Sequence, residues 1–184
     1  MMFNKRVLEG YLMVIFLASI IACQSISNQY RGATVEPDCQ ILLLEDGPHE
    51  GAWQTFDLTI EYTYEKKTDM LQLSGVAEVS DHYIELYDTL RSLYLTLYYL
   101  DTNTKVLESK LILNAPSIDI EGKFKFKHNL EIPPETTSIT FGYDGRVAAG
   151  KDGGDIFMKR PSYKAVTGLE AKCKQAKTKK LLTP

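Results

Sequence analysis

The stretch WQTFDLTIEYTYEKKTDMLQLSGVAEV, residues 53–79, contains the pattern that decides the fold. From residue 53 to residue 64, apolar or aromatic side chains alternate with polar ones. The side chains of one face are Phe56, Leu58, Ile60, Tyr62 and Tyr64. Strict alternation is typical of a β-strand with one buried and one solvated face. After a polar turn at residues 65–69 the alternation resumes over residues 70–79, with Gly75 as a predicted bulge. We therefore predict an antiparallel hairpin.

Further strands follow at hairpin spacing. Residues 90–100 are apolar on both faces, which favours a central strand, and residues 81–89 before them have the spacing of a short helix that covers it. Residues 105–113, 122–130, 138–143 and 155–158 predict more strands, and Pro116 is expected to end one of them. We predict an all-β protein, an antiparallel immunoglobulin-like or fibronectin-like sandwich of about seven to eight strands with a short helical insertion. A lipocalin-like barrel is the alternative fold.

The first 23 residues have the pattern of an export signal. Lys5 and Arg6 precede the apolar run YLMVIFLASIIA at residues 11–22, and Cys23 follows it. The run has twelve residues, fewer than the roughly 20 that a membrane-spanning helix needs. A positive flank before a short apolar run is typical of a signal peptide.

The end of this run, Ile20-Ile21-Ala22-Cys23, resembles the bacterial lipobox, and the chain thus resembles a bacterial lipoprotein precursor. The resemblance implies cleavage between Ala22 and Cys23, a diacylglyceryl group on the Cys23 sulfur, and anchoring in the cell envelope. Gln24, where an aspartate would favour the inner membrane, implies the outer membrane in a host with two membranes. An uncleaved anchor, or an ordinary signal peptide with a chance cysteine, is the alternative.

The chain divides into four predicted parts: a signal peptide (1–22), a lipidated tether (23–38), one domain (39–161) and a basic C-terminal tail (162–184). The chain is 44% hydrophobic and 24% charged, which excludes a disordered tract and a polytopic membrane protein. The predicted domain resembles an immunoglobulin-like or fibronectin-like domain of a lipoprotein. It lacks the cysteine–tryptophan–cysteine spacing of antibody domains.

Two cysteines, Cys39 and Cys173, remain besides the predicted lipidation site. An exported chain occupies a compartment that permits disulfides, so we predict a bond between them. It would close a loop of roughly 135 residues, worth about 4–5 kcal/mol in the chain-entropy model. The alternatives are two reduced buried thiols or a metal pair, and two cysteines are too few for a zinc site.

Charge is unevenly distributed along the chain. Residues 159–184 carry eight basic residues and one acidic residue, a net charge of +7, whereas residues 23–158 have a net charge of −11. The tail is a candidate for contact with an anionic surface, or it folds against its own acidic body. The lysines concerned are Lys172, Lys174, Lys177, Lys179 and Lys180. Nucleic acid is not an expected partner, because an exported protein seldom meets it.

The sequence contains no recognisable catalytic motif, and we expect neither an enzyme nor a cofactor or metal. The three histidines, His49, His82 and His128, are isolated, and His128 follows the alternation of a buried strand face. Asp81, His82 and Glu85 suggest a small acid–imidazole site, with a polar connection between strands as the alternative. The glycine-rich segment 145–155 suggests a hairpin tip rather than a calcium loop, because its carboxylates do not alternate regularly.

Tyrosines are a further indication of a binding surface, because tyrosine is favoured at recognition surfaces. The alternative explanation is that tyrosine is simply a good strand former. The predicted interaction surface comprises Tyr83, Tyr87, Tyr94 and Tyr98. We expect a non-catalytic envelope lipoprotein that binds a protein partner or an envelope polymer. The alternatives are a barrel that carries a small apolar ligand and, third, a hydrolase that uses His82 or His128.

Overall fold

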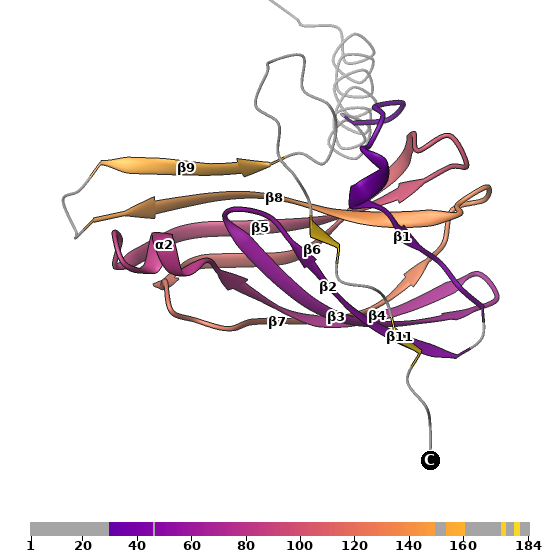
Figure 1. Ribbon diagram of the computed structural model, residues 1–184, viewed down its shortest axis with the longest axis horizontal. Coiled ribbons are helices and arrows are strands. Elements are labelled where there is room, and N and C mark those ends of the chain that lie inside the picture. The colour runs from indigo at the N-terminus through magenta and orange to yellow at the C-terminus, as the bar shows by residue number, and fades with distance from the viewer. Residues whose placement is uncertain (1–29, 46, 150–153, 161–173, 176–178, 181–184) are drawn as a thin grey trace, which may run out of the picture.

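The computed structural model describes residues 30–45, 47–149, 154–160, 174–175 and 179–180. It is an all-β sandwich of two antiparallel sheets, with one short α-helix and one 3₁₀ turn (Figure 1). Eight strands of six or more residues form two layers of four, and three two-residue strands extend the edges. The predicted sandwich is confirmed, and the predicted alternative, a barrel, is not the observed fold.

The first layer, here called the β3 sheet, has the order β2-β3-β4-β7. Its strands are β2 (Pro48–Gln54), β3 (Leu58–Lys67), β4 (Met70–Val79) and β7 (Phe124–Glu131). Two short strands of the basic tail, β10 (Lys174–Gln175) and β11 (Lys179–Lys180), pair with the free edge of β2. The hairpin predicted over residues 53–79 thus corresponds, from residue 58 onwards, to β3 and β4 at the centre of this sheet.

The second layer, the β5 sheet, has the order β6-β5-β8-β9. Its strands are β5 (Thr89–Leu100), β6 (Val106–Asp119), β8 (Ser138–Ala148) and β9 (Asp155–Arg160). β1 (Ile41–Leu42), which follows the 3₁₀ turn η1 (Pro37–Cys39), pairs with the start of β8. β5 is central, as its apolar faces predict, and the short helix α2 (Asp81–Ile84) connects β4 to it.

The strand order has the connectivity of the immunoglobulin-like Greek key. If β3, β4 and β7 are taken as strands A, B and E, then β6, β5, β8 and β9 are C′, C, F and G, in the order of that fold. From β3 to β9 the chain crosses between the sheets after β4, β6 and β7. β2 is an addition beside strand A.

Aromatic side chains from both sheets fill the space between the layers. Phe141 of β8 is fully buried, and its ring centre lies 5.9 Å from that of Trp53, 5.6 Å from Tyr62 and 6.2 Å from Phe126. These contacts join one strand of the β5 sheet to three strands of the β3 sheet. Rings of this size and spacing supply much of the stabilising burial.

Three sequence-based expectations about the strands are wrong. The alternating run from Trp53 to Tyr64 is two strands, because a turn at residues 55–57 separates β2 from β3 and leaves Phe56 69% exposed. Pro116 lies inside β6, where an edge strand tolerates the missing N–H group. Gly75 causes no bulge, because the register between β3 and β4 is continuous through it.

Part of the predicted tether packs on the domain. Tyr30 makes an edge-to-face contact with Tyr98, Thr34 forms a bridge with Lys105, and Val35 is buried. The apolar side chains in this polar-looking segment thus cover the outer face near the end of β5. The predicted boundary at residue 39 is too late, and residues 30–38 belong to the folded body.

Candidate functional site

Aromatic and apolar side chains gather at one end of the sandwich. We call this set the tip surface: Phe56, His82, Tyr83, Leu86 and Tyr87. Phe56 at the β2–β3 turn is 69% exposed, and Leu86 after α2 is 66% exposed. The four rings follow one another. The ring centres of Phe56 and His82 are 3.9 Å apart, those of His82 and Tyr83 4.2 Å, and those of Tyr83 and Tyr87 5.8 Å. Two large apolar groups are thus displayed beside a stack of rings.

A hydrogen-bonded base holds the tip surface in place. The Asp57 carboxylate accepts a hydrogen bond from the Tyr143 hydroxyl of β8 and lies close enough to the Tyr83 hydroxyl to raise the pKa of that group. Buried Thr55 lies 3.2 Å from the same Tyr143 oxygen, and its Oγ1 accepts the N–H of Leu58 at 3.1 Å. The turn that carries Phe56 is therefore tied to both sheets.

The Tyr83 hydroxyl is a neutral donor at ordinary pH. Burial, followed by the neighbouring Asp57 carboxylate, raises the pKa of Tyr83 to about 12. A charged phenolate beside a carboxylate would be repelled, so the proton stays on the oxygen. The Tyr83 ring and the Asp57 carboxylate thus hold each other in a fixed orientation, which suits a rigid binding surface.

The tip surface lies at the far end of β5 from the place where the chain enters the fold. Tyr30 packs on Tyr98, near the end of β5, whereas α2 leads into Thr89 at its start. Nine residues of strand separate these positions, or about 30 Å. Figure 1 shows α2 at the left of the body and the indigo N-terminal segment to the right of centre, above β1.

A groove of about 820 Å³ crosses the outer face of the β3 sheet. Its floor is the row Gly51–Tyr62–Gly75–Phe126, which is continuous in register across four strands. Tyr62 and Phe126 are buried among the core side chains, so this row places its side chains on the inner face. Only backbone therefore covers the outer side of the row.

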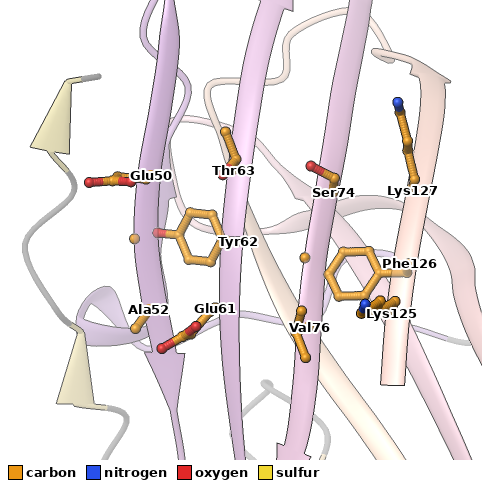
Figure 2. A pocket seen from close by; sticks show the side chains of 12 residues that line it. Glu50, Ala52, Glu61, Tyr62, Thr63, Ser74, Val76, Lys125, Phe126 and Lys127 are labelled. Carbon is orange, nitrogen blue, oxygen red and sulfur yellow. The ribbon is translucent and has the colours of Figure 1, made fainter. Parts of the chain in front are cut away.

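The two neighbouring rows point outward and form the walls of the groove. One row is Glu50–Thr63–Ser74–Lys127 and the other is Ala52–Glu61–Val76–Lys125. Figure 2 shows the carboxylates at the β2 and β3 side, the lysines at the β7 side, and the short side chains of Thr63 and Ser74 between them. The groove is thus negative at one end and positive at the other.

The four predicted surface tyrosines do not form one surface. Tyr83 and Tyr87 belong to the tip surface, and Tyr94 is 38% exposed on the outer face of β5. Tyr98 is 4% exposed and lies beneath Tyr30, so its assignment to an exposed surface is wrong. Alternation does not distinguish Phe56 as an exposed residue, because Phe56 shares the parity of the buried strand residues, although the flanking Thr55 and Asp57 are turn formers.

The histidines have separate surroundings. His128 Nε2 lies 2.6 Å from the Ile112 carbonyl and so links the edges of the two sheets, as a structural histidine. His49 is 2% exposed and stacks on Tyr64, with a ring distance of 5.1 Å. His82 Nε2 has no hydrogen-bond partner among the described residues. None of these contacts builds the predicted acid–imidazole site.

No metal site emerges from the part of the chain that the structure describes. No group of three or more His, Cys, Asp or Glu side chains there could hold a metal ion. The glycine-rich segment contributes residues 145–148 to β8 and begins β9 at Asp155, as a hairpin, and residues 150–153 lie outside the described residues.

Cys39 is buried at the end of η1, whereas Cys23 and Cys173 lie outside the described residues. Lys174 pairs with Gln54, and β10 contacts η1, so residue 174 lies near Cys39. Among the tail lysines, Lys174, Lys179 and Lys180 lie on the two strands that pair with β2, and Lys172 and Lys177 are not described. Parts of the basic tail thus fold against the acidic body.

Comparison with protein-family models, curated proteins and solved structures found no match to this chain. Within the described residues, no helix has the length and apolar character needed to cross a membrane.

Proposed function

We propose that this chain is a lipid-anchored, non-catalytic binding module of a bacterial cell envelope, and that it contacts a protein partner through the tip surface. The observation that carries the proposal is the exposure of Phe56 and Leu86, 69% and 66%, on a base that hydrogen bonds hold rigid. Large apolar side chains on a pre-ordered base lose little entropy on binding, and removing their apolar area from water favours association.

The position of the tip surface supports this assignment. With an anchor at Cys23, the seven residues 23–29 span at most about 23–25 Å between the lipid and the folded body. The tip surface lies about 30 Å along β5 from Tyr30, where the described chain begins. It is therefore directed away from the end at which the tether enters, and a partner can reach it.

The anchor rests on the lipobox resemblance and is tested by the mass of the N-terminal peptide. We expect the mature chain to begin at Cys23 with acyl chains attached, and the Cys23→Ser variant to carry none. Two or more chains anchor a protein stably, because each buried CH₂ contributes about 0.8 kcal/mol. A wild-type chain that keeps residues 1–22 and carries no acyl group would refute the anchor.

The partner contact is tested by crosslinking in cells. A photoreactive amino acid at Phe56 should give one dominant protein adduct, whereas the same group at Met70, 41% exposed at the β3–β4 turn, should not. Leu86→Ser should weaken the adduct formed from Phe56, since Leu86 belongs to the same surface. Equal adducts from both positions, or an adduct that Leu86→Ser leaves unchanged, would contradict the proposal.

The predicted disulfide belongs to the same proposal. Cys39 is not a free thiol, and the pairing of β10 with β2 brings residue 174 towards it. We propose that Cys173 is the partner, which would clamp the tail to the start of the domain.

A further inference from the structure

The groove on the β3 sheet has two unlike ends and a neutral middle. Glu61 of β3 and Lys125 of β7 lie in one register row, with Val76 of β4 between them. Adjacent strands are about 4.8 Å apart, so the two charged positions are separated by about 10 Å across the sheet. The groove therefore offers two opposite charges at a fixed spacing.

These charged groups form no salt bridge with each other or with described neighbours, although the Glu61 carboxylate also attracts Lys123, which is itself paired with Glu78. Among the described residues, neither Glu61 nor Lys125 nor Lys127 forms a salt bridge. The next lysine along β7, Lys123, does pair with Glu78, at 2.8 Å. The difference leaves Lys125 and Lys127 available at the groove.

Glu61 is a better cation acceptor than Glu50. Glu50 lies opposite Lys179 in the register of β2 and β11, and a cross-strand lysine offsets its charge. Glu61 has Ala52 and Val76 as its cross-strand neighbours. Of the two carboxylates, the one with no described lysine directly opposite it in the register is thus that of Glu61.

We propose that this groove binds a short extended peptide of about three residues, with its free amino group at Glu61 and its free carboxylate at Lys125 and Lys127. An extended chain advances about 3.3–3.6 Å per residue, so three residues match the spacing of about 10 Å. The hydroxyls of Thr63 and Ser74 supply donors and acceptors for the peptide groups between the ends. This site lies on a sheet face apart from the tip surface and depends neither on the anchor nor on the protein partner.

The proposed contacts are charge-assisted but solvent-exposed. Exposed ion pairs contribute about 0.2–1 kcal/mol each, so each one changes affinity by a factor of about 1.5 to 5. We expect weak binding that declines as salt is raised, because salt screens exposed charges. Both ends must be charged for the full effect.

The test uses triglycine as the probe and ¹⁵N-labelled full-length protein in detergent. Triglycine should cause saturable amide shifts at Thr63, Ser74 and Val76. N-acetyl-triglycine and triglycinamide, which each lack one charge, should bind more weakly by about 1.5-fold to fivefold. Glu61→Gln and Lys125→Gln should each weaken triglycine similarly, whereas Lys110→Gln on the other sheet should not.

A charge swap separates the proposed geometry from a general effect of charge. The double variant Glu61→Lys/Lys125→Glu keeps the net charge and should recover part of the affinity that either single reversal loses, with the peptide turned round and Lys127 limiting the recovery. These side chains are on the solvated face, so an unchanged thermal melting temperature verifies that the variants fold. Absence of saturable shifts, equal binding of the blocked peptides, or shifts centred on Phe56 and Leu86 would overturn the proposal and leave the tip surface untouched.

Discussion

Replacing Gly75 with alanine should destabilise the sandwich, although alanine is intrinsically the better residue in a strand. A Cβ atom built at this position would lie 2.5 Å from the Glu61 carbonyl oxygen and 2.6 Å from Phe126 Cζ. The carbonyl is part of the β3–β4 pairing, and the Phe126 ring is buried against Phe141. Neither neighbour can move away without disturbing the core.

The magnitude follows from two opposing effects. Overpacking a well-filled core costs about 1–3 kcal/mol, whereas replacing a strand glycine by alanine gains about 0.5–1 kcal/mol. We expect a net loss of about 1–2 kcal/mol for Gly75→Ala. For a chain of this size that loss lowers the melting temperature by about 2–8 °C.

Urea unfolding followed by the fluorescence of buried Trp53 would measure the effect. The control is Gly154→Ala, because nothing lies within 4 Å of a Cβ at that position, and its free energy of unfolding should stay within about 0.5 kcal/mol of wild type. In the Gly75→Ala background, Phe126→Leu should cost less than it does alone, because the two sites share one contact. An unchanged free energy of unfolding for Gly75→Ala, or strict additivity in the double variant, would refute the reasoning.

Three further predictions concern Tyr83, the hydrogen bond of His128 and the proposed disulfide of Cys39. The pKa of Tyr83 is about 12 in the folded state and about 10 in the unfolded state, so its contribution to stability is complete below pH 10 and is lost as the pH rises towards 12. Tyr83→Phe should therefore flatten the decline of the unfolding free energy between pH 10 and pH 12. Parallel curves of unfolding free energy against pH for the variant and the wild type would contradict this. His128→Leu should cost about 1–3 kcal/mol in chemical denaturation, because the Ile112 carbonyl loses its partner, whereas His128→Gln, which keeps a donor, should cost less. Cys39→Ser and reduction of the wild type should each lower the unfolding free energy by about 4–5 kcal/mol, and insensitivity of the wild type to reductant would exclude the bond.

Much of the fold was predictable because side-chain alternation is a local property. The strand over residues 58–64, its partner over 70–79 and the two apolar faces of β5 follow directly from the order of residue types. The position of the β2–β3 turn was not predictable from alternation, because Phe56 continues the apolar phase although it lies at the apex of the turn. The break between β2 and β3 shows in the hydrogen bonds of the folded chain. Thr55 Oγ1 accepts the N–H of Leu58, and the Asp57 carboxylate accepts the Tyr143 hydroxyl.

The candidate sites were far less accessible to sequence reasoning. The groove depends on the register of four strands, which places residues 52, 61, 76 and 125 side by side although they are up to 73 positions apart. The buried state of Tyr98 depends on Tyr30, which arrives from a segment that looked like a linker. Such contacts have no local signature, because they form only when distant segments pack.

By itself, the sequence determined the apolar run with its basic flank near residue 1, the strand-rich composition, and the acidic body with its basic tail, since each is written in consecutive residues. Only the tertiary structure decided which side chains share a surface. In it, Phe56 and Leu86 are exposed in the tip surface and Tyr98 is buried beneath Tyr30. Glu61 and Lys125 lie in one register row across the β3 sheet. The physical reason is that alternation specifies which face of a strand is buried, whereas strand register and sheet packing specify what each exposed residue has beside it.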